Sequence, residues 1–133
     1  SPKDLYNFPQ NKFVANFIGD ANVVKAEILD KQSNYYDLKI AEMKIKVQSD
    51  KELGETVSVA LRPEKISINK DKKENSIHAT VNNASFVGNS YQYILNSNAG
   101  KLFVISGETN NIFKVGEEVF LSINDKEVKI LND

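Results

Sequence analysis

The stretch Leu53–Leu61 reads Leu-Gly-Glu-Thr-Val-Ser-Val-Ala-Leu, and Val115–Ile123 repeats its outline as Val-Gly-Glu-Glu-Val-Phe-Leu-Ser-Ile. In both stretches a Gly-Glu pair precedes apolar residues that alternate with other residues, which is the period of a half-buried β-strand. Each stretch is followed by a second alternating segment, Ile66–Ile68 in one case and Val128–Ile130 in the other. The shared outline indicates an internal repeat built from short strands.

The repeat extends upstream in the same order. Val24–Ile28 resembles Ile77–Val81, and Lys44–Val47 resembles Lys101–Val104. A repeat of about sixty residues suits one small five-stranded barrel-like unit per half. The other interpretation is that short alternating strands resemble one another by chance. We predict a mainly β chain with two such subdomains in tandem, about 20–70 and 76–133, joined by the polar stretch Asn69–Ser76.

The first nineteen residues follow a different pattern. Apolar residues recur there at roughly helical spacing: Leu5, Phe8, Phe13, Phe17 and Ile18. Ser1 followed by Pro2 suits a helix start, and Pro9 interrupts the pattern. We predict two short helices, the second over about Asn11–Ile18 and ending near Gly19. The chain begins without a methionine, so we expect it to be a piece of a longer protein.

Composition excludes several functional classes. The 133 residues carry 17 basic and 18 acidic side chains, without the basic excess that nucleic-acid binders usually show. There is no cysteine, which removes disulfides, thiolate metal sites and cysteine nucleophiles. No apolar run approaches the roughly 20 residues that cross a bilayer.

No constellation of residues points to catalysis. The glycines do not cluster, and no Gly-x-x-x-x-Gly-Lys-Ser/Thr loop is present to hold nucleotide phosphates. The single histidine, His78, lies in an alternating segment and is expected to be a solvent-facing strand residue, since a zinc site needs three or four ligands. We therefore predict that this chain is not an enzyme and has no catalytic, cofactor-binding or metal-binding residues.

A small barrel of the oligonucleotide-binding type leaves nucleic-acid binding as the alternative function. Four tyrosines are candidate stacking platforms for a single strand: Tyr35, Tyr36, Tyr91 and Tyr93. Aromatic residues on strands more often serve packing, and no basic stripe accompanies these four. We favour packing and expect no nucleic-acid partner.

Three segments carry a family resemblance. Ser1–Gly19 resembles the segment that ends the nucleotide-binding domain of ABC importer ATPases. Leu61–Glu64 resembles the Arg-Pro-Glu that follows a strand of their regulatory barrel, and Phe86–Tyr93 resembles an aromatic and glycine turn of the transport-associated oligonucleotide-binding fold. The chain therefore resembles the C-terminal regulatory domain of a bacterial ABC importer ATP-binding subunit. The short run Asp20–Val23 resembles the spermidine/putrescine branch.

The resemblance implies a division into 1–19, the helical tail of a missing nucleotide-binding domain, and 20–133, a regulatory β domain. ATP and Mg²⁺ would belong to the missing domain. The implied partners are a second copy of the subunit and, through the missing domain, the membrane permease. The implied location is the cytoplasmic face of the membrane.

The same resemblance implies roles for individual residues. We expect the interface or regulatory positions to be Arg62, Glu64, Gly88 and Tyr91. For Arg62 and Glu64 the alternative is a surface salt bridge of little energetic value, and for Gly88 it is a turn or bulge glycine. An intracellular polyamine is a further expected partner, with four acidic candidates to meet it: Glu55, Glu64, Glu117 and Glu118. For Glu55, Glu117 and Glu118, which follow turn glycines, the alternative is a polar turn residue.

Overall fold

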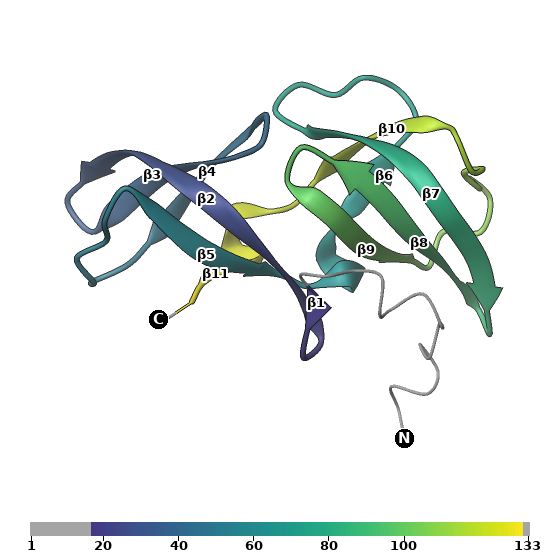
Figure 1. The fold of residues 1–133 in the computed structure, drawn as a ribbon, viewed down its shortest axis with the longest axis horizontal. Helices are drawn as coiled ribbons and strands as arrows, with labels where there is room; N and C mark the ends of the chain where they lie inside the picture. The colour runs from purple at the N-terminus through teal and green to yellow at the C-terminus, as the bar shows by residue number, and fades with distance from the viewer. Residues whose placement is uncertain (1–16, 132–133) are drawn as a thin grey trace.

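The chain folds into two curled antiparallel sheets, and the computed structural model describes residues 17–131 (Figure 1). The first sheet contains β1 (Phe17–Ile18), β2 (Ala21–Gln32), β3 (Tyr35–Ile40), β4 (Met43–Gln48), β5 (Thr56–Leu61) and β11 (Val128–Ile130). The second contains β6 (Ser67–Asn69), β7 (Ile77–Val87), β8 (Ser90–Ser97), β9 (Gly100–Ser106) and β10 (Glu118–Ser122). Two short 3₁₀ turns are η2 (Pro63–Lys65) and η3 (Asp125–Glu127). The predicted mainly β fold is confirmed.

The two sheets have the same topology, which confirms the internal repeat. Their strand orders are β11-β5-β2-β3-β4 and β6-β10-β7-β8-β9, so each strand of the first repeat has a counterpart five strands later. The last strand of each repeat is exchanged, because β6 pairs with β10 and β11 pairs with β5. The predicted halves, 20–70 and 76–133, therefore do not coincide with the two sheets.

Matching hydrogen bonds extend the repeat to single residues. The Ile28 amide donates to the Glu55 carbonyl at 3.0 Å, and the Val81 amide donates to the Glu117 carbonyl at 2.9 Å. The register of each long strand also shifts directly after Ile28 and Val81, which marks a β-bulge in both halves. Such bulges increase strand twist and help each sheet to curl.

One apolar core joins both sheets. The alternation predicted from the sequence is visible in β4, where Met43, Ile45 and Val47 are buried and the residues between them are exposed. A single cluster of buried residues contains members of the first sheet, such as Leu38, and of the second, such as Leu121. Full burial of one aliphatic side chain of this size is worth about 1.5–3 kcal/mol. The shared core therefore holds the two sheets together as one body.

The predicted second helix is wrong at its end. Phe17 and Ile18 form strand β1, which pairs with the start of β2 across a turn at Gly19 and Asp20. Gly19 has a φ of +66°, a conformation that glycine adopts at little cost. The Phe17 ring packs edge-on against Phe103 of β9, with the ring centroids 5.2 Å apart, so tertiary contact overrides the helical spacing. The first helix and the rest of the second lie outside the described residues.

The polar stretch Asn69–Ser76 is tied down at its far end. Asn75 accepts a hydrogen bond from the Lys44 amide at 2.7 Å and donates to the Lys44 carbonyl at 2.8 Å. Ser76 is buried, and its hydroxyl donates to the Lys73 carbonyl at 2.6 Å. The stretch thus connects β6 to β7 within the second sheet, so it is not the predicted linker between two halves, and it binds β4 of the first sheet. Within residues 17–131 no helix is long and apolar enough to cross a membrane.

Candidate regulatory interface

The Arg-Pro-Glu segment makes the first crossover between the sheets. Arg62 follows β5 with extended backbone angles, φ −74° and ψ 135°, as expected for a residue before proline. Pro63 is buried at the start of η2, from which the chain enters β6 of the other sheet. The Arg62 Nε lies 4.0 Å from the Glu64 Oε2, and both side chains are about half exposed. An ion pair of this kind contributes about 0–1 kcal/mol.

The second crossover repeats the backbone geometry of the first with a different side-chain contact. Between β10 and β11 the chain turns through η3, where the Asn124 side chain accepts a hydrogen bond from the Lys126 amide at 2.9 Å. Asn124 has φ −68° and ψ 138°, which matches Arg62 closely. An asparagine cap thus supports the turn at η3, whereas the turn at η2 carries the Arg62–Glu64 ion pair and no side-chain cap.

Gly88 shapes the tip of the β7–β8 hairpin. Val87 pairs with Ser90, which leaves Gly88 and Asn89 as a two-residue turn. Gly88 has a φ of +68° at the first turn position, where type II′ hairpin turns place glycine. A methyl group there would meet no atom within 4 Å, so backbone conformation and not space requires glycine. Gly88 is therefore a turn glycine.

Tyr91 belongs to a row of aromatic rings that runs from this tip into the core. Its ring lies 4.9 Å from Phe86 and 6.0 Å from Tyr93, and Tyr93 lies 5.8 Å from Phe113. Exposure changes along the row, since Phe86 is 55% exposed whereas Tyr93 is fully buried. A large aromatic residue exposed beside a rigid turn is a typical anchor for a protein contact.

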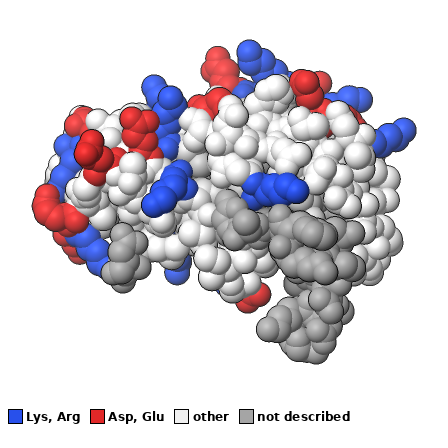
Figure 2. Space-filling model, viewed as in Figure 1, with Lys and Arg blue, Asp and Glu red and all other residues white. Residues whose placement is uncertain are grey.

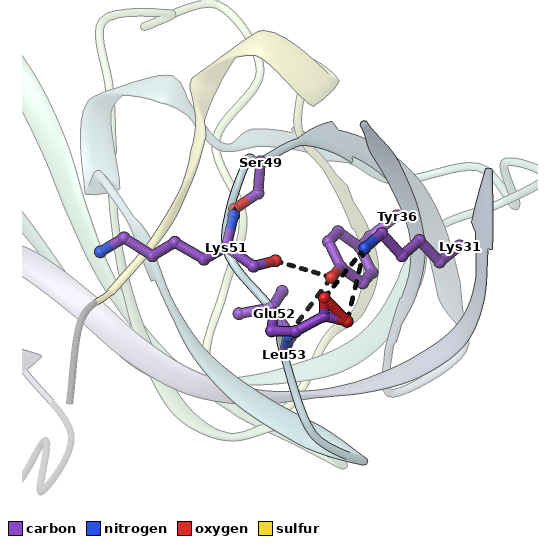
Figure 3. Close-up of polar contacts among 6 residues, drawn as sticks. All are labelled: Lys31, Tyr36, Ser49, Lys51, Glu52 and Leu53. Atoms are coloured by element: carbon purple, nitrogen blue, oxygen red, sulfur yellow. Dashed lines mark hydrogen bonds and ion pairs between the residues drawn. The ribbon is translucent and has the colours of Figure 1, made fainter. Parts of the chain in front are cut away.

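Tyr36 and Tyr93 are packing residues with equivalent tasks. The Tyr93 hydroxyl accepts a hydrogen bond from the Phe113 amide at 3.2 Å and holds the loop before β10. Burial raises the pKa of Tyr93, although the hydrogen bond from Phe113 opposes this. In the first sheet, the Tyr36 hydroxyl donates to the Lys51 carbonyl at 2.7 Å and accepts from the Leu53 amide at 3.3 Å (Figure 3). The loop before β5 is held in the same way.

A salt bridge covers the Tyr36 ring. Lys31 Nζ lies 5.4 Å above the ring centroid and 3.3 Å from the Glu52 carboxylate (Figure 3). The hydrogen bond to Glu52 raises the pKa of Lys31. Buried Tyr36 and Tyr93 cannot offer open stacking faces, which supports the packing interpretation for these two, whereas Tyr35 is 43% exposed.

The predicted interface residues fall into two separate groups. Arg62 and Glu64 lie at the crossover near the middle of the molecule, whereas Gly88 and Tyr91 lie at the far tip of the β7–β8 hairpin (Figure 1). On the face seen in Figure 2, charged side chains gather along the upper rim and over the first sheet. The described surface over the second sheet carries few of them. The hairpin tip is therefore the less charged of the candidate contact surfaces.

The sequence did not reveal Asn22 as a clasp between the sheets. Asn22 is fully buried in β2. Its Oδ1 accepts from the Phe103 amide at 2.8 Å, and its Nδ2 donates to the carbonyls of Phe103 at 2.9 Å and Leu61 at 3.1 Å. One side chain thus joins β2 and β5 of the first sheet to β9 of the second. The signal in the sequence was that Asn22, a polar residue, stands where the alternation of β2 predicts a residue that faces the core.

A second polar link joins the opposite side of the sheets. Glu42, in the turn between β3 and β4, accepts hydrogen bonds from Asn98 at 2.6 Å and from the His78 amide at 3.3 Å. Burial alone would raise the pKa of Glu42, but these hydrogen bonds hold it below the ordinary value. His78 itself is half exposed on β7, pairs with Glu118 at 3.2 Å and stacks on Phe120. It is the solvent-facing strand residue that we expected.

Gln92 departs from the rule that buried polar groups are paired. It is fully buried on β8, yet neither Oε1 nor Nε2 has a hydrogen-bond partner within the described part of the chain. A buried amide without partners costs about 1–3 kcal/mol. The sequence places Gln92 within the run Tyr91–Leu95, whose other residues are aromatic or aliphatic, a pattern that could have identified it.

The four acidic candidates for polyamine binding do not share a site. The Glu64 and Glu118 carboxylates pair with Arg62 and His78. Glu117 accepts a hydrogen bond from the Lys114 amide at 2.9 Å, and Glu55 occupies the equivalent loop of the other repeat. Among residues 17–131, no group of three or more His, Cys, Asp and Glu side chains is placed to hold a metal ion.

Comparison with known proteins agrees with this architecture. The sequence pattern of the TOBE domain matches residues 59–131, which is more than half of the chain. The Fe(3+) ions import ATP-binding protein FbpC of Fusobacterium nucleatum is 27% identical over 99% of this chain and 36% of its own length. The spermidine/putrescine import ATP-binding protein PotA of Thermotoga maritima is 26% identical over 93% of this chain and 38% of its own length. The chain thus spans little more than a third of these relatives.

A solved structure supports the fold independently. The cytoplasmic molybdate-binding protein ModG, in a crystal form with molybdate bound, superposes with a TM-score of 0.68 at 14% identity. The match covers 85% of this chain and 96% of that one. At this level of identity the similarity concerns the fold alone. From the family match and the repeated, strand-exchanged β architecture, we conclude that the chain belongs to the TOBE domain family.

Proposed function

We propose that this chain is the regulatory and dimerisation domain of the ATP-binding subunit of an ABC importer. The observation that carries the proposal is the alignment of nearly the whole chain with a little over a third of several import ATP-binding proteins. Catalysis and the binding of ATP and Mg²⁺ are then tasks of the remaining part of the subunit. The partners would be a second copy of the subunit and the membrane permease, at the cytoplasmic face of the membrane.

The contact with the second copy is proposed at the tip of the β7–β8 hairpin. Phe86 is exposed beside the rigid Gly88 turn, and Tyr91 supports it from behind. Exposed aromatic anchors on rigid supports lose little conformational entropy when they bind. Arg62 and Glu64 are proposed as a second, polar contact, because both side chains are about half exposed at the crossover.

The imported substrate is proposed to be a polyamine. Support comes from the resemblance of Asp20–Val23 to the spermidine/putrescine branch and from the relative in Thermotoga maritima. The relatives named for Fe(3+) import match stretches of similar length. The uptake experiment below therefore compares putrescine with Fe³⁺. Feedback by intracellular polyamine is the finer proposal, and calorimetric titration of this chain with spermidine tests it. Absence of saturable binding would remove the feedback role.

The importer role is tested by deleting residues 20–133 from the intact subunit assembled with its permease. We expect ATP hydrolysis to persist, association of the two subunits without nucleotide to weaken, and putrescine uptake to escape inhibition by internal polyamine. Uptake of Fe³⁺ by the same assembly would contradict the proposal that the imported substrate is a polyamine. Loss of ATP hydrolysis in a folded subunit would contradict the non-catalytic role.

A further inference from the structure

A cavity of about 550 Å³ lies at one end of the second sheet. Its walls come from the end of β6 with the following loop, residues 68–73, and from residues 110–113 of the loop between β9 and β10. Pockets of about 300–1,000 Å³ are typical of small-molecule sites. The cavity is therefore large enough for an organic ligand, and its lining includes neither residues 86–91 of the hairpin tip nor residues 62–64 of the first crossover.

The fold explains why these two loops meet. The pairings of β6 with β10, β10 with β7, β7 with β8 and β8 with β9 are all antiparallel, so β6 and β9 run in the same direction. Their carboxyl ends, Asn69 and Ser106, consequently lie at the same end of the sheet. In Figure 1 the connections that leave these strands run over the top and along the right side of the second sheet.

The polar lining of the cavity is suited to an anion. It contains three lysines and one carboxylate: Lys70, Lys72, Lys73 and Asp71. None of the three lysines forms an ion pair within residues 17–131, where the salt bridges involve other cations. The chain as a whole has a net charge of -1, so the excess of positive charge at the cavity is a local feature and not a property of the whole chain. Ammonium groups bind phosphate oxygens through charge-assisted hydrogen bonds.

Asn69 adds a donor that lacks an acceptor. Its Nδ2 is buried and has no hydrogen-bond partner within the described residues, although Asn69 lines the cavity. An unpaired buried amide is costly, and a ligand oxygen supplies the missing acceptor once the Asn69 side chain turns its Nδ2 toward the cavity. Asn110 and Asn111 contribute further side-chain amides to the same wall.

The remaining wall is apolar. Ile68, Ile112 and Phe113 line the cavity beside the polar groups, and Ile112 is 48% exposed. A bare inorganic anion would not cover this apolar surface. We propose that the cavity binds an organic phosphate, in which the phosphate contacts the lysines and Asn69 while the organic part covers Ile112. This inference does not depend on the proposed importer role.

Amide NMR spectra of the ¹⁵N-labelled chain test the site, with AMP and inorganic phosphate as probes. We expect AMP to shift the Asn69 side-chain signals and the signals of residues 110–113 in a saturable way, and added salt to weaken this binding. Inorganic phosphate should bind about tenfold more weakly, because it leaves the apolar wall uncovered. Equal binding of the two probes would overturn the assignment to an organic phosphate.

Charge and amide variants provide the controls. The double change Lys72→Gln and Lys73→Gln should weaken AMP binding about tenfold or more. Asn69→Asp should do the same, because a carboxylate repels the phosphate. The matched change Lys39→Gln and Lys129→Gln removes two exposed lysines of the first sheet and should leave AMP binding intact. Absence of saturable shifts at millimolar AMP, or equal effects of the two lysine pairs, would overturn the proposal.

Discussion

At the scale of single residues, polar side chains between the two sheets help to determine how the sheets are placed relative to each other. Asn22 on one side and Glu42 with Asn75 on the other connect strands that are far apart in the sequence. Asn22, Glu42 and Asn75 each form hydrogen bonds to backbone groups of a distant strand. These contacts fix how the two sheets sit together, whereas the apolar core supplies most of the stability.

Replacing Asn22 by alanine should destabilise the chain by about 2–3 kcal/mol, because the change removes the buried hydrogen bonds that Asn22 forms with the Phe103 amide and with two carbonyls. Urea denaturation followed by circular dichroism measures this difference. Asn96→Ala is the matched control, since Asn96 is exposed on β8 and should change stability little. A loss no larger than that of the control would contradict the clasp.

Glu42 makes part of the stability depend on pH. Its folded pKa is lower than its unfolded value, so its stabilising contribution is complete above the unfolded pKa of about 4.3 and disappears as pH falls through the folded pKa. As pH falls from about 5 to about 3, the Glu42→Gln variant should lose less stability than the parent chain. Thermal unfolding across this range checks the sign, and identical pH profiles would contradict it.

At the scale of elements, the exchanged strands are the feature that the sequence did not predict. Alternation identified the strands, and the matches around Leu53–Leu61 and Val115–Ile123 identified the repeat, because both depend on local period. Pairing partners depend on packing between distant segments. Nothing in Ile66–Ile68 or Val128–Ile130 indicates which sheet each segment joins.

Removing β11 should therefore weaken the first sheet although β11 is at the end of the chain. A chain that ends at Asn124 loses the pairing of Val128 with Leu61 and the burial of Val128, so β5 becomes an edge strand. We expect a loss of at least about 2 kcal/mol and faster amide exchange in residues 56–61.

Hydrogen exchange measured by mass spectrometry detects this change. A chain that ends at Leu131 keeps β11 and serves as the control. Unchanged protection of residues 56–61, with loss confined to β10, would show that β11 does not stabilise the first sheet.

The candidate site was only partly predictable for similar reasons. Gly88 as a turn residue and the Arg62–Glu64 ion pair follow from local sequence, and the structure contains both. The cavity beside Lys70–Lys73 does not follow from local sequence, because it forms only where two loops meet. The polar composition of Asn69–Ser76 by itself predicts only a linker or an exposed loop. The distance between the two groups of interface residues likewise depends on how the sheets are arranged.

At the scale of the whole molecule, the chain is one body with a shared core and an exposed aromatic tip. Two sheets that exchange strands and share a core make a rigid support, and a rigid support presents Phe86 at little entropic cost. Such a body is suited to hold two larger subunits together. The account therefore depends on self-association through the β7–β8 hairpin.

Sedimentation equilibrium of the chain tests this claim most directly. We predict a concentration-dependent dimer of the 14.9 kDa chain, which Phe86→Ser weakens about tenfold or more. Leu29→Ser, which changes an exposed apolar residue of the first sheet, should leave the dimer intact. A monomer up to millimolar concentration, or a dimer that Phe86→Ser does not affect, would contradict the account.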